Sequence, residues 1–233
     1  MSFSCPGESM TDTTIAGKRL PPATYIGLVL ALAGPFVPYL IDPIIFGAAL
    51  TPARVEWDIL FHWLNLAAVI SVVLFAEKLP IKSIGLEHVR WWTAPLGLLA
   101  GAIILGLSSV AVGVLKTSSN AHFVELLTSL PFMVRVVIVL TAGVFEETLF
   151  RGYALERLAA AFDSKWIAGG ITVTLFTLAH FPAVGFQHLL PIFIVSMLIT
   201  LLYLWRRDLV VNMIAHMTID GVGLLLVPFL SHH

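Results

Sequence analysis

Three apolar segments of the chain carry ionisable side chains at positions where a bilayer would surround them. A charged group inside a membrane is costly unless it is paired or hydrated, so such groups mark candidate sites of chemistry. Most of the other apolar runs carry no charge. The exceptions, with the aromatic residue that accompanies them, are Glu146, Glu147 and Arg151, then Phe176 and His180, then Asn212, His216 and Asp220.

These residue types fit the hydrolysis of a bond held within the membrane. Glu146 is the candidate general base toward a trapped water. One of His180 and His216 can orient that water or protonate a leaving amine, and the other can stabilise the oxyanion together with Asp220 or Asn212. Asn212, His216 and Asp220 recur at every fourth position, so they share one helix face.

The neighbouring charged pair is predicted to support this site. Glu147 followed four residues later by Arg151 is the favourable order for an ion pair on a helix. Glu146 lies about 100° further round the helix, so it points elsewhere, and its fourth neighbour is Phe150 rather than a cation. Phe176 is expected to pack against its neighbours. Glu147, Arg151, Phe176 and Asn212 are therefore predicted supporting residues.

The same side chains permit a second chemistry. Glu146, His180 and His216 would form a set of two histidines and one carboxylate, which is common in catalytic zinc sites with an open position. The compact HExxH zinc motif is absent from the sequence. A glutamate-activated water and a divalent metal, zinc in particular, both remain open at this point, so the sequence establishes no cofactor.

The composition is that of a membrane protein. Hydrophobic residues make up 58% of the 233 residues, charged residues make up 12%, and the mean hydropathy is +0.95. The 13 Lys and Arg nearly balance the 14 Asp and Glu, so no basic excess is present to neutralise phosphates. We exclude nucleic acid as a partner. The single cysteine, Cys5, can form neither an internal disulfide nor a cysteine-based zinc site.

The elements that must position these residues are predicted to be transmembrane helices. A helix of roughly 20 apolar residues crosses the hydrocarbon core, and lipid tolerates only helices or closed barrels. We predict an all-α polytopic bundle of about seven spans, with eight as the upper count. The apolar runs lie near residues 24–41, 57–77, 92–115, 131–150, 166–182, 188–205 and 209–230.

The bundle is predicted to be one unit with three parts. Residues 1–23 form a polar cytoplasmic tail that lacks the apolar stretch of a cleavable signal peptide, so the first run stays as a membrane anchor. Residues 24–130 form the N-terminal transmembrane helices. Residues 131–230 contain all the candidate site residues and form the predicted catalytic core.

The distribution of basic residues predicts a cytoplasmic N-terminus. Counted along the helices from their ends, Glu146 and His216 then lie about 8 to 10 Å from the inner edge, so we expect a water-accessible cavity in the inner half of the bilayer. The inner side collects Lys18, Arg19, Lys78, Lys82, Arg90, Arg151, Arg157, Lys165, Arg206 and Arg207, whereas the outer side holds Arg54, Lys116 and Arg135.

The motifs that contain these residues resemble those of a known family. EETLFR resembles its EExxxR motif, FTLAH resembles FxxxH, and HMTID resembles HxxxN/D. The family is that of the CAAX protease and bacteriocin-processing (CPBP, or Abi) intramembrane proteases. All three motifs occur in the family's order, and the resemblance covers residues 131–222.

The resemblance implies an endopeptidase that cleaves membrane-associated proteins or peptides near their C-termini. It assigns Glu146, His180, His216 and Asp220 to the catalytic site, with Glu147 and Arg151 as support. Family members have been described both as metalloproteases and as glutamate-dependent enzymes. Asp220 departs from the asparagine of the eukaryotic prenyl-processing members, which makes its oxyanion role less secure.

The implied substrate differs between the eukaryotic and the bacterial members of the family. Eukaryotic members act on prenylated proteins, whereas many bacterial members resemble enzymes of bacteriocin maturation, self-immunity or protein sorting. The compact chain favours the bacterial type, located in a prokaryotic cytoplasmic membrane, and nothing in the sequence identifies a prenyl pocket.

Three other interpretations compete with a CPBP protease. GLSS, which includes Ser108, resembles the GxSx of a rhomboid serine protease but leaves Glu146 and Glu147 unexplained. Buried Glu, His and Asp residues also form proton relays in proton-coupled transporters, although no internal repeat is visible here. A non-catalytic immunity protein is the third interpretation.

Overall fold

The computed structural model describes residues 20–47, 51–118 and 120–231, and the described residues contain helices and no strands. The predicted all-α class is therefore confirmed. The predicted tail falls almost wholly outside the described residues. The elements are α1 (Pro22–Ala33), η1 (Gly34–Phe36), α2 (Val37–Ile45), α3 (Pro52–Ser71), η2 (Val72–Ala76), η3 (Ile81–Ile84), α4 (Thr93–Leu115), α5 (Ala121–Thr128), α6 (Phe132–Glu146), η4 (Glu147–Leu155), α7 (Glu156–Phe162), α8 (Lys165–Ala179), α9 (Phe181–Val184), η5 (Phe186–His188), α10 (Leu189–Arg206), α11 (Leu209–Gly221), η6 (Val222–Leu226) and α12 (Val227–Ser231).

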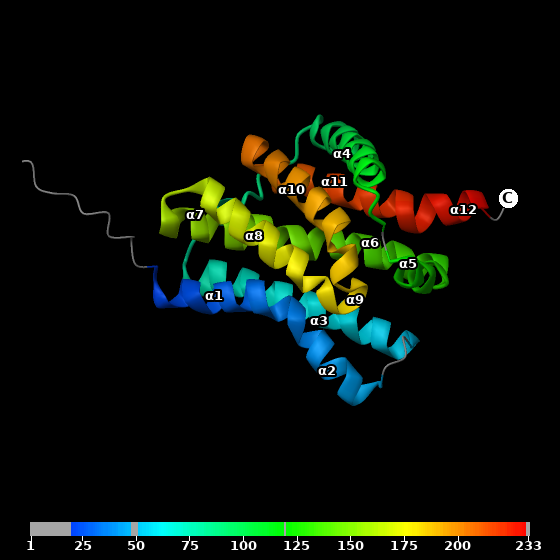
Figure 1. Ribbon diagram of the computed structural model, residues 1–233. Coiled ribbons are helices and arrows are strands. Elements are labelled where there is room, and N and C mark those ends of the chain that lie inside the picture. Colours follow the sequence, from blue (N-terminus) through cyan, green and yellow to red (C-terminus); the bar gives the residue numbers. More distant parts are fainter. Residues whose placement is uncertain (1–19, 48–50, 119, 232–233) are drawn as a thin grey trace, which may run out of the picture.

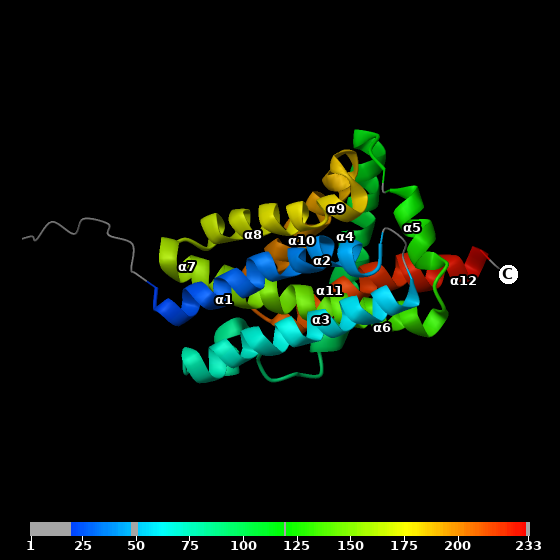
Figure 2. The same ribbon diagram turned by 90° about the horizontal axis from the view of Figure 1, so that it is seen from below.

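The helices assemble into a polytopic membrane bundle. Within the described residues, 6 helices are long and apolar enough to cross a membrane, and the count rises to 7 if one bent pair is a single span. That pair is α5 with the continuous helix Phe132–Phe162, bent by 119°. The start of α1 and the end of α12 lie at opposite ends of the bundle, and α7 and α5 mark the same two ends in both views (Figures 1 and 2).

Side-chain caps fix where several of these helices begin. An exposed NH group at a helix start needs an acceptor, and a preceding Thr, Asn, Ser or Asp supplies one. Asp208 accepts from the backbone NH groups of Val210 and Val211 at the start of α11, and Asn120 accepts from that of Phe123 at the start of α5. These caps set the register of the helices that carry His216 and that line the cavity described below.

The long helix through the first motif changes its geometry at the motif itself. After Glu146, the α-helix α6 continues as the π-helix η4, and every residue from Glu147 to Leu155 is buried. π-helical turns are rare and frequently occur at functional sites. The widened turn carries both Glu147 and Arg151 into the interior of the bundle.

Two glycines let α11 approach its neighbours closely. A Cβ on Gly101 of α4 would lie 2.7 Å from the carbonyl oxygen of Ala215, and a Cβ on Gly143 of α6 would lie 2.5 Å from Cγ of Met217. Small residues at such positions are how membrane helices pack without a hydrophobic driving force. The result is that α11 is held between α4 and α6 with His216 directed toward the first motif.

An ion pair secures the end of the bundle at which α3 meets α7. Glu77 follows the span and accepts hydrogen bonds from Arg157, Thr24 and Tyr153, with 2.7 Å between Arg157 Nη2 and Glu77 Oε2. Burial alone would raise the pKa of Glu77, but these hydrogen bonds and the charge of Arg157 hold the pKa below its ordinary value.

This lowered pKa predicts acid-sensitive stability. The contribution of Glu77 is complete above its unfolded-state pKa and is lost as the pH falls through its folded-state pKa. We expect Glu77→Gln to lower the free energy of unfolding by about 1.5–3 kcal/mol at pH 7. The deficit should shrink toward pH 3 in thermal unfolding of the detergent-purified protein. The exposed Glu87→Gln is the control, and a deficit that grew on acidification would contradict the prediction.

Candidate active site

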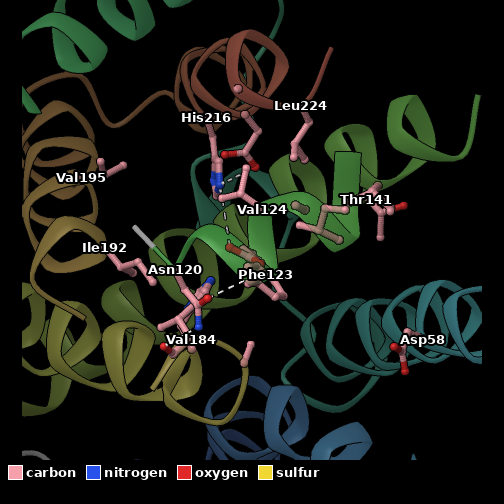
Figure 3. Close-up of a pocket in the computed structure, with 18 of the residues that line it drawn as sticks. Asp58, Asn120, Phe123, Val124, Thr141, Val184, Ile192, Val195, His216 and Leu224 are labelled. Carbon is pink, nitrogen blue, oxygen red and sulfur yellow. Dashed lines mark hydrogen bonds and ion pairs between the residues drawn. The ribbon is translucent and has the colours of Figure 1, made fainter. Parts of the chain in front are cut away.

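A cavity of about 700 Å³ gathers side chains from all three motifs. Glu146 of α6, His180 after α8, and His216 and Asp220 of α11 all line it. Figure 3 shows His216 and Asp58 on different walls of this cavity, with Phe123 of α5 between them in this view and Asn120, which precedes α5, below His216. The structure therefore brings together the four residues that the sequence singled out as catalytic.

Behind the cavity wall, Glu147 is the centre of a buried polar cluster. Its side chain is fully buried. One oxygen, Oε1, accepts from Arg151 Nη1 at 2.9 Å and bonds His216 Nδ1 at 2.8 Å. The other, Oε2, accepts from Asn212 Nδ2 at 3.2 Å. A buried carboxylate with this many donors is satisfied in the interior, so Glu147 holds other side chains in place.

Arg151 connects this cluster to α10. Its Nε donates to Thr200 Oγ1 at 3.2 Å, and its Nη2 donates to Ser196 Oγ at 2.8 Å. The guanidinium carbon lies 4.4 Å from the centre of the Phe176 ring, which is cation–π distance. Arg151 thus neutralises Glu147 and ties the first motif to the second.

The contact with Glu147 orients the imidazole of His216. Because a carboxylate can only accept, His216 Nδ1 carries the hydrogen in this bond, and Nε2 faces the cavity. Nε2 lies 3.4 Å from Asp220 Oδ2 and 3.8 Å from Glu146 Oε2. The separation from Glu146 is too long for a direct hydrogen bond and short enough for one water molecule to contact both groups.

His180 is oriented in the same way by its own helix. Its Nδ1 donates to the carbonyl oxygen of Phe176 at 2.9 Å, so Nε2 is the ring nitrogen that takes no part in this bond. The rings of Phe176 and His180 lie 4.7 Å apart, and those of Phe176 and His216 lie 6.4 Å apart. Phe176 is therefore a packed spacer between the two histidines and Arg151.

Asn212 does not face the cavity, although it shares the helix face with His216. Its side chain is fully buried and donates to Glu147 and to the carbonyl oxygen of Ile199, 3.0 Å away. An amide held in this way positions Glu147 and cannot reach an oxyanion in the cavity. Of the two residues considered for that role, only Asp220 lines the cavity.

The side chains as they stand do not form a metal-binding group. Among the described residues, no cluster of three or more His, Cys, Asp and Glu side chains has the arrangement that a metal ion needs. Glu146, His180 and His216 share the cavity without meeting this condition.

Sequence reasoning missed several residues of the cavity. Tyr39, Asp58 and His62, from the N-terminal helices, line it together with α5. The pair Asp58 and His62 carried a signal, since the two ionisable residues stand four apart, on one face of a predicted span. Asn120 joins the start of α5 to the end of α9 in the cavity wall, because its Nδ2 donates to the carbonyl oxygen of Val184 at 3.0 Å.

Ser108, the candidate nucleophile of the serine-protease interpretation, lies elsewhere. It is buried in α4, and its hydroxyl donates to the carbonyl oxygen of Leu105 at 3.0 Å. It is not one of the described residues that line the cavity. The structure therefore gives this serine a packing position and no contact with the candidate site.

Residues of all three motifs thus converge on one cavity of a polytopic helical bundle. Residues 128–222, under half of the 233-residue chain, match the family described as type II CAAX prenyl endopeptidase Rce1-like. This match confirms the CPBP resemblance drawn from the motifs. No curated protein and no solved structure matches the chain. The family implies a multi-pass membrane protease with a membrane-associated peptide substrate.

Proposed function

We propose that the protein hydrolyses a peptide bond with a water molecule activated by Glu146. The observation that carries this proposal is the placement of Glu146 in the cavity, 3.8 Å from the Nε2 atom of an oriented His216. The Glu146 side chain is 21% exposed, so it can reach water and substrate, unlike its buried neighbour Glu147. The two adjacent glutamates thus have separate roles, one chemical and one positioning.

The proposed reaction consumes one water and returns the site to its starting state. Glu146 takes a proton from the water, and the resulting hydroxide attacks the carbonyl carbon of the substrate. His180, in its protonated form, stabilises the oxyanion. The C–N bond breaks, and His216 passes the proton from Glu146 to the leaving amine. Asp220 holds the protonated His216 by its contact at 3.4 Å.

The substrate is proposed to be a membrane-associated protein or peptide, with or without a lipid, processed near its C-terminus or matured as an exported peptide. Residues 131–230 form the catalytic core in this proposal, and the helices within residues 24–130 complete the cavity wall through Tyr39, Asp58 and His62. The protein would lie in a prokaryotic cytoplasmic membrane with its N-terminus in the cytoplasm.

The test is proteolysis of a membrane-anchored peptide library by the detergent-purified protein, with products identified by mass spectrometry. We expect cleavage at a defined bond that continues in the presence of a strong chelator. Loss of cleavage on chelation, with recovery on adding Zn²⁺, would contradict a purely glutamate-activated water and favour the metal interpretation.

The same assay tests the serine-protease alternative. Ser108→Ala is expected to change kcat/KM by less than about twofold, because the hydroxyl contacts only its own helix among the described residues. Thermal unfolding of this variant should match that of the wild type. A Ser108→Ala protein that folds and no longer cleaves would overturn the assignment of Glu146 as the base.

A further inference from the structure

The residues that line the cavity lie between the middle of the bundle and one of its ends. Its walls include Arg54 and Asp58 near the start of α3, Asn120 before α5, Pro191 near the start of α10, and Leu224 beyond α11. Consecutive spans run in opposite directions, so the start of α10 and the end of α11 lie on the same side of a membrane. This is the end marked by α5 and α12, away from α7 (Figures 1 and 2).

Toward the other end, the bundle behind the site is packed. Leu149 and Tyr153 of η4 are fully buried, as are Ile84 of η3 and Leu209 of α11. The backbone NH of Leu209 donates to the carbonyl oxygen of Gly85 at 2.9 Å, which joins two loops across this end. Together with the buried Glu147–Arg151 cluster, these side chains separate Glu146 from the end that carries α7.

The basic residues gather at the packed end. Short loops rich in Lys and Arg stay in the cytoplasm, which is the strongest sequence determinant of orientation. Among the described residues near helix ends, the packed end has Lys78, Lys82, Arg90, Arg157, Lys165, Arg206 and Arg207, whereas the end with the cavity has Arg54, Lys116 and Arg135. Some arginines at each end have partners: Arg54 pairs with Asp42 and Arg135 donates to the carbonyl oxygen of Leu224 at the cavity end, and Arg157 pairs with Glu77 and Arg207 with Glu156 at the packed end. The excess of basic residues at the packed end remains when paired arginines are left out of both counts.

We propose that the cavity opens on the non-cytoplasmic side of the membrane and that its substrates are outward-facing or exported peptide segments tethered to the membrane. The substrate part of this inference rests on the proposed proteolysis, whereas the side of the opening does not. The expectation of a cavity in the inner half of the bilayer does not hold with this orientation, because the lining helix ends belong to the outer side. Cytosolic prenylated C-termini would meet the packed end.

Cysteine labelling in membrane vesicles tests the side of the opening. The sequence has one cysteine, so Cys5→Ser gives a cysteine-free background. Glu125→Cys and Glu87→Cys are a matched pair, since both residues are exposed and lie at opposite ends of the bundle. Val124→Cys, at a lining position that is 39% exposed, reports on the cavity wall. A membrane-impermeant maleimide is applied to right-side-out and to inside-out vesicles.

We expect Glu125→Cys and Val124→Cys to label at least about tenfold faster in right-side-out vesicles, and Glu87→Cys to show the reverse. The opposite pattern would overturn the inference, whatever the activity of the protein. The substrate part is tested with two reporters that carry the same peptide library and the same anchor, with the library facing outward in one and inward in the other.

Cleavage of the outward-facing reporter supports the substrate class, and cleavage of the inward-facing reporter alone would contradict it. If neither reporter were cleaved while the labelling pattern held, the proposed proteolysis would fail and the outward opening would stand. The two failures are therefore separable.

Discussion

Replacing Glu146 with glutamine is expected to lower kcat/KM for peptide cleavage by about 100- to 10,000-fold, the usual contribution of a general base. An amide has nearly the shape of the carboxylate but cannot accept a proton from water at neutral pH. The fold should not respond, because Glu146 is partly exposed to the cavity and its nearest ionic partner, His216, is 3.8 Å away. The measurement is steady-state cleavage of the best peptide from the library, with thermal unfolding of the same preparation.

Glu125→Gln is the matched control, because it makes the same chemical change at an exposed position of α5. It should leave both activity and unfolding temperature near the wild-type values. A Glu146→Gln protein with more than about a tenth of wild-type activity would show that another group takes the proton. Loss of activity accompanied by a lower unfolding temperature would instead point to a structural role for this glutamate.

The residues of the candidate site could be singled out because polar side chains are rare in membrane helices. A carboxylate or imidazole in an apolar run has few structural explanations, and the spacing of Asn212, His216 and Asp220 places them on one face whatever surrounds the helix. The same spacing did not show which of the three side chains face the cavity and which face the interior. Asn212 faces Glu147 in the interior while Asp220 lines the cavity, and only the packing of α11 against α6 and α10 decides this.

The helix around the first motif was predicted to end too early. The apolar run stops near residue 150, yet the helix continues to Phe162, because its later charged side chains have buried partners. Arg157 pairs with Glu77, and Glu156 accepts from Tyr203 at 2.9 Å. A hydropathy average over a short stretch of sequence treats every charged residue as exposed to water. It therefore cannot show that Glu156 and Arg157 have partners 47 and 80 residues away.

The contribution of α5 to the cavity could not be predicted from the sequence. The connection between the predicted spans at 92–115 and 131–150 contains α5, a helix of only 8 residues whose role depends on the 119° bend at its end. Nothing in its eight side chains predicts that bend. The contact that fixes α5, from Asn120 to the carbonyl oxygen of Val184, joins segments 64 residues apart.

Arg151→Met is expected mainly to lower the free energy of unfolding, whereas Glu146→Gln is expected mainly to lower kcat/KM. Removing one member of a buried ion pair leaves the other charged and desolvated, which typically costs about 3–5 kcal/mol. Glu147 would keep His216 and Asn212 as donors but lose the guanidinium that pairs with it. The free energy of unfolding in mixed micelles measures this cost directly.

Arg207→Met is the matched control, because Arg207 also pairs with a glutamate, Glu156, but its side chain is 70% exposed. Its loss should cost less than about 1 kcal/mol, as solvent screens such pairs. The double variant Arg151→Met with Glu147→Gln should recover part of the loss, giving a coupling of about 1–3 kcal/mol between the two positions. If both single arginine variants were equally stable, the buried cluster would not be what holds His216 toward Glu146, and the separate roles of the adjacent glutamates would lose their structural basis.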